Sequence, residues 1–212
     1  MLHIKRFIFN PFGENTYLIW SDHNNAAIID PGMMSDYEND TVAKFIKDNN
    51  LNLQRLINTH AHIDHMAGNG FIEKNYTLTP EYNEADNYLA EHLKEQAKMF
   101  GIPYTGDDII SMKNLADNQT IKIDELELHI IHIPGHTKGH ICIYSAQDAS
   151  LFSGDALFRM SIGRTDLPGG NYNELINSIT SRIMPLPGAT IIYPGHGETT
   201  TVEFERAHNP YL

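Results

Sequence analysis

The densest group of metal-binding side chains lies in residues 59–65, which read Thr-His-Ala-His-Ile-Asp-His and directly follow a short apolar stretch. Neutral imidazole and carboxylate are ligands that zinc and neighbouring divalent metals prefer. Residues two apart in extended backbone project to the same side, so His60 and His62 can chelate one ion. Asp64 and His65, where the chain turns, can address a second ion. The competing interpretation, a solvated polar loop, is disfavoured because so many ligands are concentrated at the end of an apolar strand.

Three isolated residues share the setting of this run. His136, Asp155 and His196 each follow a predicted strand, and each comes directly after a glycine. Glycine suits positions where the backbone turns or approaches another group closely. Any one of the three alone is more typical of a turn. Together with residues 60–65 they make seven donors at strand ends, where a sheet presents its loops to one shared site.

The cysteine and charge composition narrows the classes of protein. The chain has 212 residues with 12 His and one Cys, so it has no internal disulfide and no cysteine-rich zinc module. Histidine and carboxylate must therefore hold any metal. The formal net charge of −12, from 27 acidic and 15 basic residues, argues against a nucleic-acid partner and against an anionic membrane surface.

Targeting segments are not evident in the sequence. No run of residues is long and apolar enough to span a bilayer, and charges interrupt the apolar N-terminal stretch, unlike a signal peptide. Together with the single Cys142, this pattern leads us to expect a cytoplasmic location.

The predicted elements alternate between β-rich and helical regions. Apolar bursts separated by turn residues predict three strands at 4–9, 16–20 and 26–29, in an antiparallel meander, and a strand at 55–58. Helical spacing predicts helices over 36–48 and 81–100, the latter ended by Gly101 and Pro103. Strands at 120–123, 126–133, 140–145, 150–153 and 189–193 and helices over 172–183 and 200–206 follow. This order predicts an α/β fold, an αββα sandwich of two mixed β-sheets with helices outside, as one domain over 1–212.

The order of the seven donors resembles a known family. His-x-His-x-Asp-His followed by isolated His, Asp and His resembles the metallo-β-lactamase superfamily, whose αββα sandwich carries a metal site at one edge. The resemblance covers essentially the whole chain, including the Asp30-Pro31-Gly32 turn and residues 208–212. Residues 154–158, Gly-Asp-Ala-Leu-Phe, and 162–166, Ile-Gly-Arg-Thr-Asp, are similar to the glyoxalase II branch, and most to its short, single-domain bacterial members.

The resemblance implies two divalent metal ions and assigns a ligand to every donor. His60, His62 and His136 would hold the first metal, Asp64, His65 and His196 the second, and Asp155 would bridge them together with a water or hydroxide. Zinc is the favoured metal, and the resemblance also permits iron or manganese.

The activity that the resemblance implies is hydrolysis of S-D-lactoylglutathione to D-lactate and glutathione. Paired divalent ions lower the pKa of water towards about 7 and polarise the carbonyl that is attacked. Asp64 and Asp155 would be the catalytic residues, working with the hydroxide. The partner would be a small-molecule thioester, a glutathione conjugate, and the oligomeric state is left open.

Substrate binding is where the chain departs from the full-length glyoxalase II pattern. Full-length members bind glutathione with a helical C-terminal extension, for which too few residues follow His196, so we expect another part of the chain to bind the substrate. Lys138, Arg159 and Arg164 are the basic residues nearest in sequence to ligands, although surface or structural ion pairs explain them equally well. The apolar residues at 99–104 suggest either a lid or core packing, with core packing favoured.

Two further alternatives stay open. Asp30 either orients a ligand imidazole or accepts hydrogen bonds of the turn before Pro31. Persulfide dioxygenases, which use one iron, share the Gly-Arg-Thr-Asp run but usually have Cys where Ile162 stands. The commonest secreted zinc β-lactamases have Arg at the position of His65 and Cys at that of Asp155, which disfavours antibiotic hydrolysis.

Overall fold

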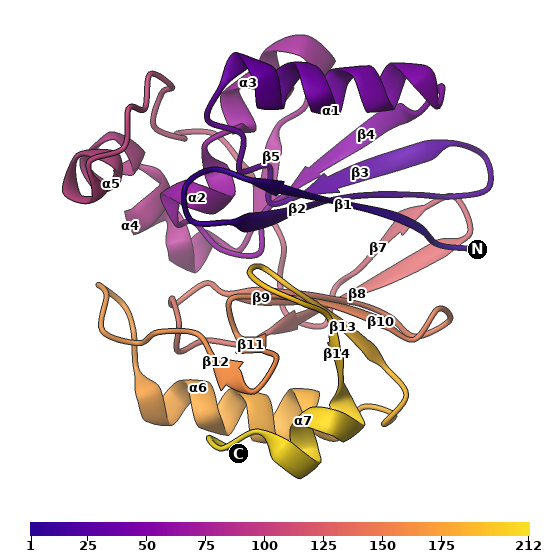
Figure 1. Cartoon of the computed structure of the whole chain (residues 1–212), viewed down its shortest axis with the longest axis vertical. Helices are drawn as coiled ribbons and strands as arrows, with labels where there is room; N and C mark the ends of the chain where they lie inside the picture. Colours follow the sequence, from indigo (N-terminus) through magenta and orange to yellow (C-terminus); the bar gives the residue numbers. More distant parts are fainter.

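Two six-stranded sheets face each other, and helices cover their outer faces (Figure 1). The computed structural model describes residues 1–212. In the first sheet the strand order is β1-β2-β3-β4-β5-β6, and in the second it is β14-β13-β10-β9-β8-β7. These layers confirm the predicted αββα sandwich.

The first sheet is built from the N-terminal half of the chain. Its strands are β1 (His3–Phe9), β2 (Glu14–Trp20), β3 (Asn25–Ile29), β4 (Asn52–Ile57), β5 (Pro80–Tyr82) and β6 (Lys113–Asn114). Strands β1 to β3 form the predicted antiparallel meander, and β3 to β6 pair in parallel. The sheet is therefore mixed, as expected.

The second sheet comes from the C-terminal half. It contains β7 (Thr120–Ile123), β8 (Leu126–His132), β9 (Ile141–Ser145), β10 (Ser150–Gly154), β13 (Ile191–Pro194) and β14 (Thr200–Thr201). Its pairs are antiparallel except β10 with β13. A separate short hairpin of β11 (Leu157–Phe158) and β12 (Ser161–Ile162) follows β10.

Helices bury the outer face of each sheet. Over the first sheet lie α1 (Asp36–Asp48) and α3 (Asn69–Tyr76), and over the second lie α6 (Tyr172–Ser178), the π-helical turn η2 (Ile179–Ile183) and α7 (Val202–His208). Helix α1 has the predicted bounds because Ser35 and Glu38 form a capping box at its start. None of the helices combines the length and the hydrophobicity that a membrane-spanning segment needs.

The main core fills the space between the sheets. Side chains alternate along each strand, so Tyr17 and Ile19 of β2 face Ile143 of β9 and Phe152 of β10, while Leu18 packs under the helices. Burying an aliphatic or aromatic side chain of this size contributes about 1.5–3 kcal/mol. The two sheets are thereby held as a rigid pair, and the loops at their shared edge are fixed relative to each other.

The single helix predicted over 81–100 is wrong. That segment begins as β5 and continues as η1 (Glu84–Asp86), α4 (Asn87–Ala90) and α5 (Leu93–Phe100). The helical spacing of its apolar residues is real, but Asp86, at the junction of η1 and α4, is buried and accepts hydrogen bonds from Ala61, Thr137 and Gly139. These tertiary hydrogen bonds override the local helical preference at that point.

Candidate metal centre

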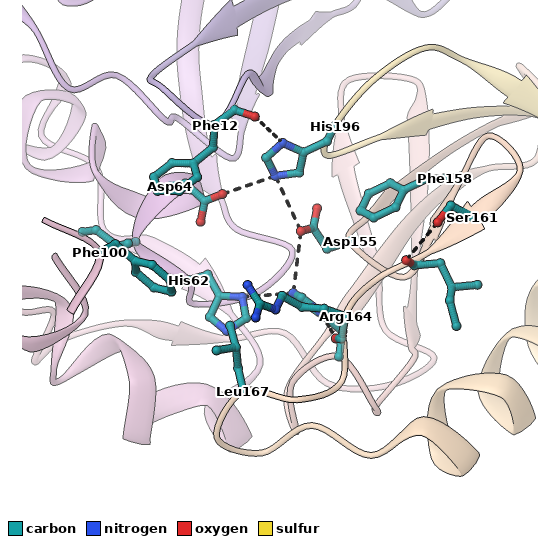
Figure 2. Close-up of a pocket in the computed structure, with 13 residues that line it drawn as sticks. Phe12, His62, Asp64, Phe100, Asp155, Phe158, Ser161, Arg164, Leu167 and His196 are labelled. Atoms are coloured by element: carbon teal, nitrogen blue, oxygen red, sulfur yellow. Dashed lines mark hydrogen bonds and ion pairs between the residues drawn. The ribbon is translucent and has the colours of Figure 1, made fainter. Parts of the chain in front are cut away.

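All seven predicted ligands meet at one edge of the two sheets. The run His60 to His65 follows β4 and enters the short helix α2 (Ile63–Met66). His136 follows β8, Asp155 follows β10, and His196 follows β13. Figure 2 shows side chains from both halves of the sandwich, such as His62 and Asp155, directed towards a common space.

The first group of ligands consists of three buried histidines. Nε2 of His136 lies 3.2 Å from Nε2 of His60 and 3.0 Å from Nδ1 of His62. These three nitrogens form one cluster with metal-ligand geometry. Metal–nitrogen bonds of about 2.0–2.1 Å in a tetrahedral zinc site place two ligand nitrogens about 3.3 Å apart. The spacing in this group therefore matches what one divalent ion requires.

The second group pairs a carboxylate with two histidines. Oδ2 of Asp64 lies 3.2 Å from Nε2 of His196, and the Nε2 atoms of His65 and His196 are 3.3 Å apart. These atoms form a second cluster with ligand geometry. Asp155 lies between the groups, with Oδ2 3.7 Å from Nε2 of His136 and 3.6 Å from Nε2 of His196.

The hydrogen bonds that the imidazole rings make away from the candidate metal site indicate whether the nitrogens facing the site carry a proton. Nδ1 of His136 donates to the carbonyl of Arg164 at 2.7 Å, and Nδ1 of His196 faces the carbonyl of Phe12 at 3.2 Å. Because a neutral imidazole carries one N–H, a ring that donates outwards presents a lone pair inwards. The lone pair of His136 then points at Nε2 of His60, 3.2 Å away, and Oδ1 of Asp155 has no hydrogen-bond partner. This donor set fits divalent cations.

Electrostatics differ between the two groups. Burial lowers the pKa of His60 well below its usual value and that of His62 to about 3, so both rings are neutral and available as ligands. His65 behaves oppositely: burial lowers its pKa, but the carboxylates of Asp155 and Asp64 outweigh burial and raise it well above the usual value. The second group thus attracts positive charge, and a divalent ion would replace the proton on His65.

Asp30 settles one of the alternatives left by the sequence. Its Oδ2 accepts from Nδ1 of His65 at 3.1 Å and from the hydroxyl of Thr59 at 2.6 Å, and its Oδ1 accepts from the Thr59 amide. The Thr59 hydroxyl in turn lies 3.0 Å from Nδ1 of His60. Asp30 therefore orients one histidine from each group, in addition to ending its strand.

An open cavity of about 380 Å³ lies against the metal-binding residues. Its walls are largely apolar, and its lining residues outside the ligand set are Phe12, Ile63, Phe100, Phe158, Ser161, Ile162, Arg164 and Leu167. The ring of Phe12, from the β1–β2 turn, packs edge-on against the ring of Phe100, and the two ring centroids are 5.9 Å apart. Figure 2 shows the stick-drawn Phe12, Phe100 and Arg164 around the ligands.

Of the three nominated basic residues, only Arg164 lines this cavity. Its Nε and Nη2 bind Asp166 at 2.7 and 2.8 Å. Lys138 instead lies over the Tyr88 ring and Arg159 over the Phe204 ring, at 5.3 and 4.6 Å from the ring centroids. Lys138 and Arg159 are therefore occupied elsewhere.

The apolar residues at 99–104, for which both a lid and core packing were considered, do not all have the same role. Phe100 lines the cavity, whereas Ile102 and Tyr104 pack against the core beneath α5. Phe12 and Phe158 were not foreseen as cavity residues. Phe12 sits in an Asn-Pro-Phe-Gly turn whose exposed aromatic residue was the available signal.

A model of the metallo-beta-lactamase superfamily matches residues 9–196. The sequence is 39% identical over 212 residues to hydroxyacylglutathione hydrolase GloC of Haemophilus influenzae, covering 100% of this chain and 98% of GloC. The crystal structure of BLEG-1 B3 metallo-beta-lactamase is similar with a TM-score of 0.89 and 31% identity, covering 99% of each chain. That of TTHA1623 in a di-iron-bound form is similar with a TM-score of 0.87 and 30% identity, covering 98% of this chain and 100% of TTHA1623.

Proposed function

The chain belongs to the metallo-β-lactamase superfamily, and from that premise we propose a two-metal thioesterase that hydrolyses S-D-lactoylglutathione or a similar glutathione thioester. The observation that carries this proposal is the convergence of the seven candidate ligands, as two groups of three with Asp155 between them. Similarity to GloC along nearly its whole length supports the substrate class.

The ligand groups would divide two divalent ions between them. His60, His62 and His136 would hold one, Asp64, His65 and His196 the other, and Asp155 would contact both. Two such ions, when bound, supply hydroxide from water at neutral pH and polarise the carbonyl under attack. Zinc suits this nitrogen-rich, cysteine-free set of ligands. Iron is an alternative because the similar protein TTHA1623 has a di-iron-bound form, and manganese is a third candidate.

The carboxylates of Asp64 and Asp155 would orient the attacking water. Both line the cavity, and both place Oδ2 within 3.6 Å of Nε2 of His196. A carboxylate oxygen in this position accepts a hydrogen bond from a water and directs its lone pair at the substrate. The leaving group is a thiolate, which is a weak base and needs little assistance from an acid.

The cavity walls would hold the rest of the substrate. The apolar side chains of Phe12, Phe100 and Leu167 limit access of bulk water to the reacting carbonyl. Arg164 offers the cationic group that lines the cavity, and because Asp166 occupies Nε and Nη2, its Nη1 would meet a substrate carboxylate. An arginine binds carboxylates through directed hydrogen bonds, which suits one carboxylate of a glutathione conjugate.

The test is release of free thiol from S-D-lactoylglutathione by the metal-loaded protein, with the chelated protein as control. Rapid thiol release that disappears on chelation supports the proposal. The alternative, a persulfide dioxygenase with one iron, predicts oxygen consumption with glutathione persulfide and no thioester cleavage. A chromogenic β-lactam in the same assay separates the proposal from the activity named for BLEG-1.

A further inference from the structure

We propose that Asp86 is a positioning residue that holds the His60, His62 and His136 group in ligand geometry; this inference rests on the metal sites of the proposed function. Asp86 ends η1 and is completely buried. It makes no contact with the cavity and does not belong to either ligand group. Its role follows from where its carboxylate hydrogen bonds go.

The Asp86 carboxylate joins the two loops that carry the first ligand group. Its Oδ2 accepts from the amide of Ala61 at 3.1 Å and from the hydroxyl of Thr137 at 2.7 Å. Its Oδ1 accepts from the amide of Gly139 at 2.6 Å. Ala61 lies between His60 and His62, and Thr137 directly follows His136. One buried carboxylate thus fixes the separation of the loop with two ligands from the loop with the third.

The peptide groups around Ala61 depend on side chains for their hydrogen bonds. Gln96 of α5 donates to the carbonyl of Ala61 at 3.0 Å and accepts from the amide of Ile63 at 3.1 Å. Because the Ala61 amide donates to Asp86, both the N–H and the carbonyl of Ala61 are hydrogen-bonded to side chains. The extended backbone that points His60 and His62 to the same side is therefore imposed by Asp86 and Gln96.

The second ligand group is held by different side chains. His65 is oriented by Asp30, and the loop that carries His196 is held by Asn15, whose Nδ2 donates to the carbonyls of Pro194 and Gly197 at 2.9 Å. Asp86 contacts neither of these supports. Loss of Asp86 should therefore weaken metal binding by the first group and leave binding by the second group unchanged. A general loss of stability would instead weaken both.

Asp86→Asn is the informative change because it keeps the shape of the side chain and replaces one of its two acceptor oxygens with a donor. An amide has one acceptor oxygen and one NH2 group, so the NH2 would face the backbone N–H either of Gly139 or of Ala61, whereas the Thr137 hydroxyl could turn to accept from it. Such donor–donor contact pushes the two loops apart. Loss of a hydrogen-bonding partner behind metal ligands typically lowers metal affinity by about 10–100-fold.

The experiment measures the zinc affinity of each site alone, by competition with a chromogenic chelator. His65→Ala with His196→Ala leaves the first site, and His60→Ala with His136→Ala leaves the second. We expect Asp86→Asn to weaken zinc binding by about 10–100-fold in the first background and to leave it unchanged in the second. The cobalt(II) absorption spectrum of the first site should change with it.

Thr137 provides a milder, matched pair of variants should Asp86→Asn fail to fold. Thr137→Val removes one of the three donors and should weaken only the first site, whereas Thr137→Ser keeps the hydroxyl and should restore its affinity. Equal weakening of both sites, or an unchanged first site in both tests, would overturn the role of Asp86. Absence of zinc binding in both unmodified backgrounds would instead overturn the metal sites of the proposed function and this inference with them. Because the experiment measures zinc affinity, its result does not depend on whether the substrate is a glutathione thioester.

Discussion

Oδ1 of Asp155 lies 3.4 Å from Nε2 of His65, and both side chains are buried. Oδ2 of the same carboxylate faces His136 and His196, which belong to different ligand groups. The backbone amide of Asp155 donates to Nε2 of His140 at 3.0 Å, which fixes the carboxylate from behind. One side chain is thereby placed where two adjacent cations would share it.

Asp155→Asn should lower metal content and turnover together. The amide replaces one anionic oxygen with a donor, so the two ions lose their shared negative charge. We expect kcat to fall by about 10²-fold or more, as when an electrostatic stabiliser is removed from an active site. Metal analysis and thiol release on the same preparation check this. Asp107→Asn, at an exposed carboxylate paired with Lys94, is the control and should behave as wild type.

Gly195→Ala should disrupt the centre through sterics alone. A Cβ at this position would lie 2.2 Å from Oδ1 of Asp155 and 2.7 Å from Cε1 of His65. Both neighbours are candidate ligands held by other contacts, so metal content should drop without any change in ligand chemistry. Gly70→Ala is the matched control because a Cβ there meets no atom within 4 Å. Full metal occupancy in Gly195→Ala would show that these side chains move freely.

Arg164→Gln should raise KM for a glutathione thioester by about tenfold, equivalent to about 1.4 kcal/mol of binding, with a smaller effect on kcat. The reason is that Arg164 is the basic residue lining the cavity. Arg159→Gln serves as control, since Arg159 lies over Phe204 away from the ligands. Steady-state kinetics of all three proteins check the prediction, and an unchanged KM in Arg164→Gln would remove Arg164 from substrate binding.

Glu14→Gln should stabilise the metal-free protein at high pH. Burial raises the pKa of Glu14 well above its usual value of 4.5, although His65 opposes the shift. A raised folded-state pKa means that Glu14 favours folding at low pH and that this contribution is lost as the pH rises.

The melting temperature of Glu14→Gln should therefore exceed that of wild type at pH 8, and the gap should close towards pH 4.5. For a chain of this size, 1 kcal/mol corresponds to about 2–4 °C. Thermal unfolding of chelated protein at both pH values measures the gap. Glu198→Gln, at an exposed side chain, is the control. A gap that widens as the pH falls would reverse the assigned sign.

Much of the fold was accessible from the sequence because local patterns and tertiary packing agree. Helix α1 carries both its cap and its apolar stripe, and the meander β1–β3 alternates apolar bursts with turn residues. The segment 81–100 failed because its hydrogen bonds are non-local. The carboxylate of Asp86 binds residues 25 to 53 positions away, which no local pattern reveals.

The convergence of the seven candidate ligands was also predictable, because His and Asp residues that follow strands lie where a sheet presents its loops to one shared site. The residues that support them do not stand out in the same way. Asp30 and Asn15 are ordinary polar residues until the fold places them against His65 and the His196 loop. The cavity wall was hidden for the same reason, since Phe12 and Phe100 are far apart in sequence and meet only in the folded chain.

The most direct test of the two-metal thioesterase is a zinc titration of the chelated protein with thiol release from S-D-lactoylglutathione followed at every addition. The ligand geometry predicts saturation at two ions per chain, with full activity reached only as the second site fills. Saturation at a single ion, or two bound ions without thioester cleavage under any metal tested, would contradict the account.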